Sequence, residues 1–293
     1  MINYNSSAAL RSFLDQEGLG MRKKFGQNFL INPAVRQTLV EALNAQEGDE
    51  VWEIGPGLGA MTAMLLEKKL KVKAFEIDGG FIRILKCEFA EDKNFCLVEG
   101  DVMKTWKSNA SVCCDAAGGE PACNASPFLF GNLPYNIAAA FIADLIENGC
   151  LFRRMVVTVQ KEVALRMTAS SGSRDYSSFS VLCTSAYNVK SLTVIRPSSF
   201  YPQPNVDSMA VLLENKNAPP PGPVFFPLVR ALFSSRRKTI KNNLSVFCAS
   251  RFGNPALSAR FLQENALSGS ERAEELMTEV FLSLAKSIEN VRL

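Results

Sequence analysis

The chain has 293 residues, of which 47% are hydrophobic and 21% are charged, a balance typical of globular proteins and not of disordered ones. This length accommodates one large core and a smaller second domain, and the net charge of +3 says little about partners. The sequence contains no histidine, which excludes imidazole as a general base or as a metal ligand.

The eight cysteines are scattered, with only Cys113 and Cys114 adjacent and no C-x-x-C pair. This spacing indicates neither a metal site nor a disulfide framework, and reduced thiols in a cytoplasm are the simplest interpretation. The amino terminus lacks a basic start followed by an apolar segment, and no hydrophobic run approaches the length of a membrane span. We therefore expect a cytoplasmic protein that binds no metal and does not enter a membrane.

Two helices separated by a basic turn are predicted at the start of the chain. Apolar residues recur at helical spacing within residues 6–17. The following turn, RKKFGQNFL at 22–30, combines amide and aromatic side chains with three cations, Arg22, Lys23 and Lys24. A basic loop that docks its aromatic rings is the plain interpretation of this turn. Asn32 and Pro33 form a good cap and first-turn pair, so a second helix is expected to begin there.

The stretch EVWEIGPGLGAMT at 50–62 has the pattern of a strand, a glycine turn and a helix. Gly55, Gly57 and Gly59 allow a tight turn and the close approach of a ligand, because no Cβ stands in the way. The free N–H groups of the following helix suit a polar or anionic group. Gly55, Gly57 and Ala60 also fit a dinucleotide-binding fingerprint, and a turn without a ligand is a third interpretation.

Acidic residues end the next two predicted strands. KVKAFEID at 71–78 ends in Glu76 and Asp78, and an acid about twenty residues beyond the glycines can hold both ribose hydroxyls. Glu76 is the better candidate of the two. NFCLVEGD at 94–101 ends in Asp101, which can accept a hydrogen bond from the exocyclic amine of an adenine. A hydride-transfer enzyme has no special need for this second acid, so the pattern favours S-adenosylmethionine over a nicotinamide cofactor.

A fourth strand and an apolar helix flank the tetrapeptide NLPY within residues 128–146. Asn132 can accept a hydrogen bond from an exocyclic amine, and the carbonyl of Leu133 or Pro134 can accept the second N–H. Tyr135 can stack on the ring of a planar base. A plain structural turn is the alternative.

Further along, residues 105–127 lack periodicity and predict a surface loop, whereas residues 154–160 predict a fifth strand followed by a helix. Residues 180–195 continue with a helix and a strand. Phe200 falls in a proline-stiffened loop before the last strand. It is therefore a candidate for the second wall of an aromatic clamp opposite Tyr135.

The run NKNAPPPGP at 215–223 has the composition of a linker, which divides the chain into a domain at 1–214 and a helical domain at 224–293. The second domain opens with five cations and no acid among them: Arg230, Arg236, Arg237, Lys238 and Lys241. We expect a helix on which Arg237 and Lys241 share a face, so that two or three of these cations contact phosphates. A solvated helix face is the alternative.

These motifs, in this order, resemble the small-subunit ribosomal RNA adenine dimethyltransferases of the KsgA/RsmA family over roughly residues 20–285. The motifs are RKKFGQNFL, EIGPGLGAMT, FEID, EGD, NLPY, VQKEVA, SFYPQPNVDS and SSRRKTIKNNL. The resemblance implies an α/β class I methyltransferase fold, with a Rossmann-like, seven-stranded, mostly parallel sheet and a small all-helical C-terminal domain. It also implies cofactor contacts by Asn28, Leu30, Gly55, Glu76, Asp101 and Asn132, to which the glycine turn itself adds Gly57.

The resemblance further implies dimethylation of two adjacent adenosines near the 3′ end of small-subunit rRNA, by a monomer acting on a maturing ribosomal particle. S-adenosyl-L-methionine would be the methyl donor. The catalytic set would be Asn132, Leu133, Pro134, Tyr135 and Phe200, and the RNA contacts Arg22, Lys23, Lys24, Arg236, Arg237, Lys238 and Lys241. The chain departs from the family pattern in its long loop at 105–127 and in Gly79 and Gly80, which stand where charged residues are usual.

Three rival functions are weighed against this interpretation. A large-subunit adenine dimethyltransferase of the antibiotic-resistance type shares the catalytic plan, but NLPY and SSRRKTIKNNL favour the small-subunit branch. A ribosome-assembly factor that acts mainly by binding would tolerate damage in the cofactor motifs, and the sequence shows none. A nicotinamide oxidoreductase leaves NLPY and the basic segment unexplained.

Overall fold

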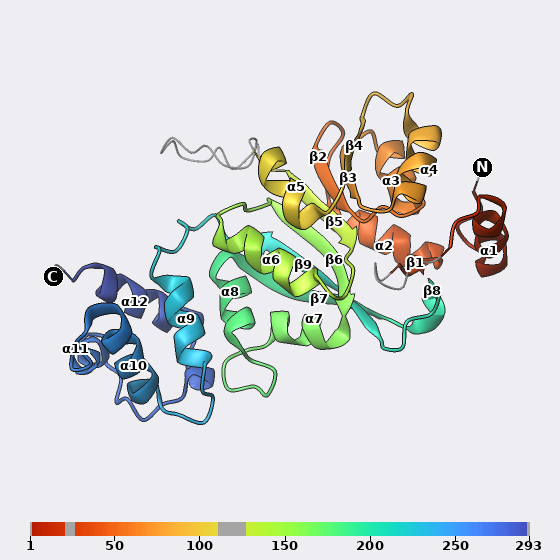
Figure 1. Cartoon of the computed structure of the whole chain (residues 1–293). Coiled ribbons are helices and arrows are strands. Elements are labelled where there is room, and N and C mark those ends of the chain that lie inside the picture. Colours follow the sequence, from red (N-terminus) through yellow and green to blue (C-terminus); the bar gives the residue numbers. More distant parts are fainter. Residues whose placement is uncertain (1, 21–26, 111–126, 292–293) are drawn as a thin grey trace. The chain divides into compact units, whose positions relative to one another are not determined.

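The computed structural model describes residues 2–20, 27–110 and 127–291. Its contacts divide the chain into two compact units, which are Met1–Ala164 with Lys190–Asn215, and Leu165–Val189 with Lys216–Leu293 (Figure 1). The second unit therefore takes in residues 165–189, which the division by composition placed in the first domain. Each unit has its own hydrophobic core.

The first unit is built on a seven-stranded sheet of order β4-β3-β2-β5-β6-β9-β7. The pairs β4–β3, β3–β2, β2–β5 and β5–β6 are parallel, and β9 runs antiparallel to β6. The strand order reverses between β2 and β5, and in such sheets ligands bind beyond the carboxyl ends of the strands at this point. The strands are β2 (Glu50–Ile54), β3 (Lys71–Glu76), β4 (Phe95–Glu99), β5 (Phe128–Asn132), β6 (Arg154–Gln160), β7 (Tyr187–Ile195) and β9 (Ser208–Asn215). This topology confirms the predicted fold class.

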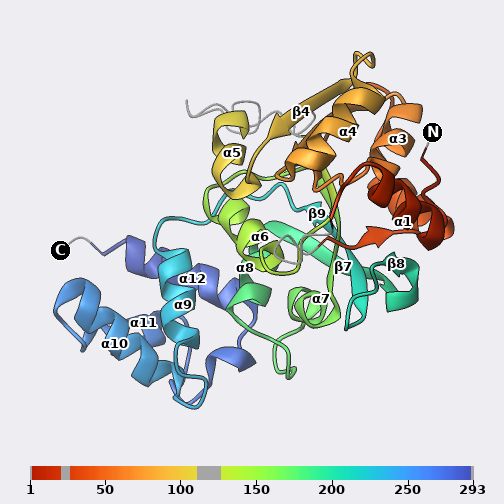
Figure 2. The same cartoon turned by 45° about the vertical axis from the view of Figure 1, so that its right-hand side comes forward.

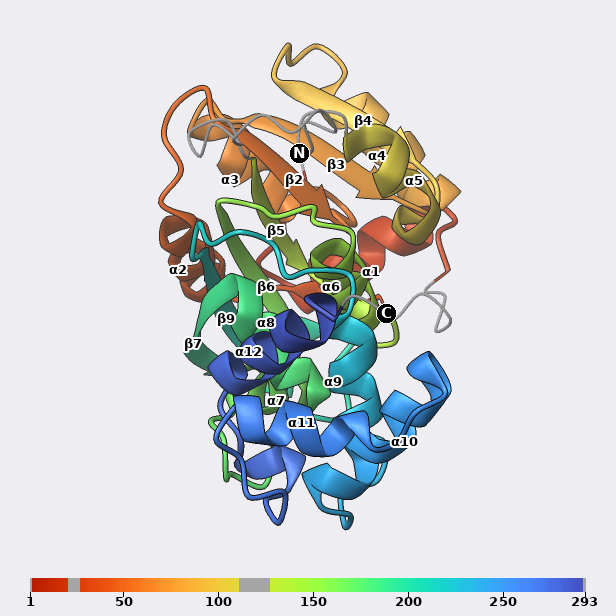
Figure 3. The ribbon, with the colours of Figure 1, turned by 90° about the vertical axis from the view of Figure 1, so that its left-hand side faces the viewer.

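Helices cover both faces of the sheet, with α2, α3 and α4 on one face and α5 and α6 on the other (Figures 1, 2 and 3). Leu39 of α2 and Leu65 of α3 pack with Val51 and Phe128 of the sheet in one buried cluster. Trp52 of β2 packs on Phe75 of β3, and their ring centroids lie 4.9 Å apart. The helices of this part are α2 (Pro33–Leu43), α3 (Ala60–Glu67), α4 (Gly79–Phe89), α5 (Val102–Asn109), α6 (Ala138–Glu147) and α7 (Lys161–Thr168).

The N-terminal helix α1 (Ser7–Gln16) gathers with β1 (Phe29–Leu30) and β8 (Phe200–Tyr201) at one end of this unit (Figures 1 and 2). The short turn η3 (Pro197–Ser199) leads into β8, and β8 pairs antiparallel with β1. The predicted helix starts are confirmed, since the Ser6 side chain caps α1 and the Asn32 side chain caps α2 ahead of Pro33.

One predicted loop was wrong at its start. Residues 105–109 belong to α5 and not to a loop, because Asp101 caps this helix and Trp106 anchors it in the core. The Trp106 indole N–H also donates to Asp144 Oδ2 across 2.8 Å. The rest of the expected loop, residues 111–126, lies outside the described residues.

The described residues of the second unit form helices and their connections, apart from residues 187–189, which begin β7. Phe225, Phe261 and Phe281 are fully buried in its core, and Tyr176 joins this core by donating its hydroxyl to the Leu276 carbonyl across 2.9 Å. This bond draws the polar loop before α8 into the helical unit. The elements are α8 (Ser178–Ala186), α9 (Phe225–Phe233), α10 (Ile240–Phe252), α11 (Leu257–Glu264), η4 (Ala273–Glu275) and α12 (Thr278–Glu289).

Candidate active site

A cleft opens at the carboxyl edge of the parallel strands, with about 960 Å³ of empty space when its open mouth is included. Its walls come from six segments of the chain, and four of these lie at or directly after the ends of β2, β3, β4 and β5. The other two are the stretch 27–30 and the N-terminal segment that holds Tyr4 and Leu10. The predicted site residues that line the cleft are Asn28, Leu30, Gly55, Gly57, Glu76, Asp101, Asn132 and Pro134.

The glycine turn after β2 requires glycine for two reasons at Gly57. Its φ of +59° is a conformation that other residues rarely adopt. A Cβ at this position would also lie 2.9 Å from Cε1 of Phe29, which is closer than real Cβ contacts. Because the turn is this tight, the Gly57 N–H donates to Glu76 Oε2 across 3.1 Å. The glycine turn and the end of β3 therefore form one rigid edge of the cleft.

Glu76 is buried at the end of β3 and still faces the cleft. Besides the Gly57 bond, its Oε1 accepts the N–H groups of Ile77 at 2.9 Å and Asp78 at 2.8 Å. Burial raises the pKa of Glu76 to about 7, although these three N–H groups favour the ionised form. Near neutral pH the group can therefore take up or release a proton.

The acid on the next strand is held by its own helix. Asp101 caps α5 by accepting the Met103 N–H at Oδ1 across 3.0 Å, and the residue lines the cleft. A capping carboxylate has a fixed position, because its backbone and one oxygen are both set by the helix start. Asp101 therefore stands beside the segment after Glu76 as a second preorganised acceptor.

Asn132 has one amide atom bonded and the other without a partner. Its Nδ2 donates to the Asn28 carbonyl across 2.7 Å. Because a carbonyl can only accept, this bond identifies the amide nitrogen and so fixes the orientation of the side-chain amide. Its Oδ1 is buried and accepts no hydrogen bond from any of the described residues. An unpaired buried acceptor is costly, and at a functional site it indicates a partner supplied by a ligand.

The prediction offered two backbone carbonyls beside Asn132, and the structure distinguishes them. The Pro134 carbonyl accepts the N–H groups of Ile137 at 3.0 Å and Ala138 at 3.1 Å, which begins α6 and fills both of its lone pairs. The Leu133 N–H donates to the Thr158 carbonyl at 3.0 Å, whereas the Leu133 carbonyl accepts no backbone N–H within the described residues. Leu133 is thus the one of these two carbonyls that has a free lone pair, although the residue is only 1% exposed and does not line the cleft.

The aromatic clamp does not form as expected. Tyr135 is half-buried and its hydroxyl is hydrogen-bonded to Ser208. Phe200, the expected second wall, is only 1% exposed, so it cannot offer a face to a base in this structure. The physical reason is the pairing of β8 with β1, which sets Phe200 opposite Leu30 and packs both into the core of the first unit.

Two further residues that line the cleft, Tyr4 and Leu10 of the N-terminal segment, were not predicted from the sequence. The Tyr4 hydroxyl donates to the Leu58 carbonyl of the glycine turn across 3.0 Å. Buried Arg36 of α2 holds this segment, because its Nη1 donates to the carbonyls of Tyr4 at 3.3 Å and Leu30 at 2.7 Å. The amphipathic face of α1 was the one signal available, and it does not identify the surface it contacts.

The predicted RNA contacts are placed differently from the expectation. Arg22, Lys23 and Lys24 lie outside the described residues. Arg236, Arg237 and Lys238 lie in a turn between α9 and α10 and not on a helix, so the expected helical arrangement was wrong. Helical periodicity is broken there because Asn243 of α10 caps the end of α9 and the turn, donating to the carbonyls of Leu232 at 2.8 Å and Ser235 at 3.3 Å.

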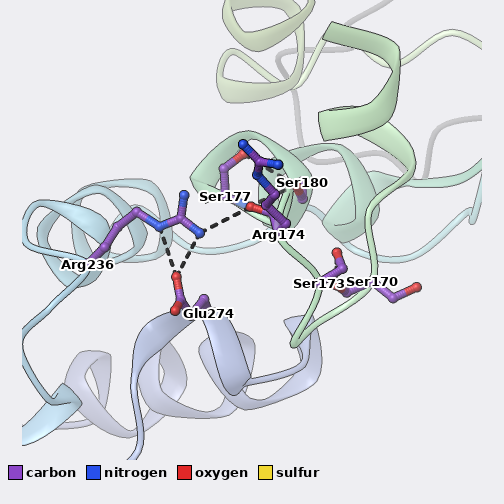
Figure 4. A network of polar contacts seen from close by, with 7 residues as sticks. All are labelled: Ser170, Ser173, Arg174, Ser177, Ser180, Arg236 and Glu274. Carbon is purple, nitrogen blue, oxygen red and sulfur yellow. Dashed lines mark hydrogen bonds and ion pairs between the residues drawn. The ribbon is translucent and has the colours of Figure 1, made fainter. Parts of the chain in front are cut away.

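Arg236 is already engaged within the second unit. It forms an ion pair with Glu274 Oε2 at 2.7 Å and donates to the Arg174 carbonyl across 3.3 Å (Figure 4). The side chains of Arg237, Lys238 and Lys241 are exposed. Among the described cations of this segment, these three are therefore the ones best placed to meet a phosphate.

Within the described residues, no helix is long and apolar enough to cross a membrane. No group of three or more cysteine, aspartate or glutamate side chains in the same residues is placed to hold a metal ion. The cleft is therefore the candidate functional site of the first unit.

Residues 18–286 match the family described as Ribosomal RNA adenine dimethylase. The Ribosomal RNA small subunit methyltransferase A of Treponema denticola is 46% identical over 295 residues, which cover 98% of this chain and 96% of that protein. The protein of the same name from Borreliella burgdorferi is 40% identical over 289 residues, covering 98% and 95%. Both relatives match almost from end to end.

Solved structures agree with the sequence comparison. The crystal structure of a dimethyladenosine transferase from Plasmodium falciparum has a TM-score of 0.70 at 25% identity, covering 88% of this chain and 96% of that one. The 23S rRNA methyltransferase ErmE has a TM-score of 0.62 at 19% identity, covering 89% and 99%, and supports the fold alone. On these grounds the chain belongs to the ribosomal RNA adenine dimethylase family.

Proposed function

We propose that the protein transfers methyl groups from S-adenosylmethionine to the exocyclic amines of two adjacent adenosines near the 3′ end of small-subunit rRNA. Membership of the adenine dimethylase family supports the reaction, and the names of the relatives at 40–46% identity support the small subunit. The observation that carries the proposal is the unpartnered Oδ1 of Asn132, a buried acceptor beside the cleft-lining Pro134. An adenine amine is the kind of donor that this atom lacks.

The residues of the cleft fit S-adenosylmethionine. The fit rests on the lining of the cleft, because glycines follow β2 and an acid ends or follows each of β3 and β4. Glu76 would hold the ribose hydroxyls, Asp101 would accept from the adenine amine of the cofactor, and the backbone at Gly55 and Gly57 would lie against its chain. Asn28 and Leu30 would complete the wall on the side of β1. When bound, the cofactor supplies a methyl group that its sulfonium has already activated.

The protein's own part in the reaction is to orient the target amine. The two amine N–H groups would donate to Asn132 Oδ1 and to the Leu133 carbonyl, which directs the nitrogen lone pair toward the donor side of the cleft. Tyr135 would stack on the base. No strong base is needed to prepare the amine, which agrees with a chain that contains no histidine.

The second unit is proposed to dock on rRNA in a maturing ribosomal particle. Support comes from the exposed cations Arg237, Lys238 and Lys241. The basic sequence Arg22, Lys23 and Lys24 is proposed as a further rRNA contact. In this proposal the first unit carries out the methyl transfer and the second unit binds the rRNA. A ribosomal substrate places the protein in the cytoplasm, where we expect it to act as a monomer.

Methyl transfer to undermethylated small subunits tests this function directly. We expect tritium from labelled S-adenosylmethionine to map to two adjacent adenosines, and Asn132→Ala to slow transfer about 100-fold by misplacing the amine. Asn265→Ala is the matched control, since its Oδ1 is also buried and unpartnered among the described residues but lies in the helical unit. Label confined to large-subunit rRNA, or full activity in Asn132→Ala, would contradict the proposal.

A further inference from the structure

Ser208 begins β9 with a side chain that is completely buried. It pairs in register with Gln160 at the end of β6, which places it at the carboxyl edge of the parallel strands. Its hydroxyl is hydrogen-bonded to the Tyr135 hydroxyl, 2.5 Å away, and makes no other hydrogen bond within the described residues. Since a buried hydroxyl needs a partner, each of these two side chains constrains the other.

This bond fixes the direction of the Tyr135 ring. The phenolic oxygen lies on the axis that runs from Cβ through the ring, so anchoring it fixes that axis. The other end of the side chain is fixed by the backbone, because Pro134 restricts the turn and its carbonyl begins α6. Tyr135 is nevertheless only half-buried, which leaves part of the ring accessible.

The sheet connects this anchor to the acceptor of the amine. Asn132 of β5 pairs with Thr158 of β6, and Gln160, two residues further on, pairs with Ser208 of β9. Paired residues share a face of a sheet, and so do alternate residues of one strand. Asn132, Thr158 and Ser208 therefore project from the same face of three adjacent strands. The spacing between the amine acceptor and the ring anchor is set by strands and not by a loop.

We propose that Ser208 is a positioning residue for methyl transfer, which holds the Tyr135 ring in the orientation that stacks on the target adenine. This role rests on the proposed function, because it acts through Tyr135. A ring that is already oriented binds the base without losing rotational freedom, so more of the complexes have the amine in reach of the methyl donor. Without Ser208 the same ring would sample several directions.

A double-mutant cycle tests this role with saturating S-adenosylmethionine and undermethylated small subunits in single-turnover experiments. We expect Ser208→Ala and Tyr135→Phe each to slow transfer about tenfold, and the double variant to be no slower than either one. Affinity for S-adenosylmethionine should stay unchanged in all three. A wild-type rate in Ser208→Ala, or losses that multiply in the double variant, would overturn the role.

Two further variants separate positioning from folding and from the function itself. Ser185→Ala removes another buried hydroxyl, one that donates to the Leu182 carbonyl across 2.7 Å, and should keep the wild-type rate. Rates are compared well below each unfolding midpoint, and Ser208→Cys replaces Ser208→Ala if the latter does not fold. If Tyr135→Ala is fully active, the proposed function of that ring fails. If Tyr135→Ala is impaired while the Ser208 variant is not, the positioning role alone fails.

Discussion

Gly57 and Glu76 are joined by a hydrogen bond of 3.1 Å from the backbone N–H of one to Oε2 of the other, across two neighbouring parallel strands. The bond links the two features that the sequence placed at a cofactor site. It also couples the shape of the glycine turn to the charge of the acid, because the N–H prefers the ionised carboxylate. Three of the predictions below follow from this pair.

Replacing Glu76 with alanine should weaken S-adenosylmethionine binding at least tenfold. The variant loses hydrogen bonds from two ribose hydroxyls to a charged acceptor, each of which contributes roughly 1.5–3 kcal/mol. Calorimetry measures the effect, with Glu99→Gln as the control, because Glu99 is the register partner of Glu76 on β4 and has no assigned ligand. Unchanged affinity for S-adenosylmethionine, with NADH bound instead, would contradict the cofactor assignment.

Cofactor affinity should rise with pH up to about 7 and then level off. Burial raises the pKa of Glu76 to about 7, and the ribose hydroxyls need its ionised form, so affinity falls about tenfold for each pH unit below that value. Stability of the free protein has the opposite sign. The pKa of the Glu76 carboxyl is 4.5 in the unfolded chain and about 7 in the folded protein. Its contribution to stability is therefore fully present at pH values below 4.5 and is lost as the pH rises through 7.

A second buried acid must be separated from Glu76 in that experiment. Burial also raises the pKa of Glu53 to about 7, against a hydrogen bond from Thr62 that lowers it, and the charge of Asp78 contributes to the raised pKa of Glu76. Glu76→Gln should abolish the pH dependence of binding, whereas Glu53→Gln should retain it. If the pH dependence of binding disappears in the Glu53 variant, the titrating group is Glu53 of β2 and not Glu76 of β3.

Gly57→Ala should destabilise the protein and weaken cofactor binding. Its φ of +59° costs a residue with a Cβ roughly 1–2 kcal/mol, and the added atom would meet Phe29 at 2.9 Å. Gly149→Ala is the matched control, because its φ of +71° carries the same strain while nothing lies within 4 Å of the added atom. Denaturant unfolding and calorimetry on both variants should show a similar loss from strain, and a loss of binding in Gly57→Ala alone.

Replacing both Arg237 and Lys241 with alanine should reduce the salt dependence of small-subunit binding. Each lost phosphate contact removes roughly 0.7–0.9 from the slope of log affinity against log salt, so the double variant should lose about 1.5. Arg236→Ala is the control. The Arg236 guanidinium is already paired with Glu274, so its removal should change the slope little. An unaltered slope in the double variant would mean that these cations form a solvated face, and Arg22, Lys23 and Lys24 would be tested next.

The parts of the site that were predicted correctly depend on short stretches of chain. A strand followed by glycines or by an acid is visible within ten residues. β2 and β5 end at Ile54 and Asn132 as predicted, whereas β3 and β4 end two residues before the predicted stretches do. All four ends lie at the edge that bears Glu76 and Asn132. The family assignment is confirmed for the same reason, because it rests on such local motifs in order.

The parts that could not be predicted depend on distant pairings. Burial of Phe200 follows from its pairing with Leu30, 170 residues away in the chain, and no local pattern signals it. The ion pair of Arg236 with Glu274 likewise joins residues 38 positions apart. Tyr4 reaches the glycine turn across 54 positions. In each case the residue type was visible, and its partner was not.

The packing of α1 limits how far the chain can be shortened. Leu10 and Leu14, with Ile2, cover Leu58 and Phe81 in a single buried cluster. A truncated protein that starts after residue 17 would leave Leu58 and Phe81 exposed to water as a hydrophobic patch beside the open cleft. Exposed hydrophobic patches of this kind promote self-association. Proteolytic removal of this segment would therefore cause aggregation. It would also lower cofactor affinity, because Tyr4 and Leu10 would no longer line the cleft.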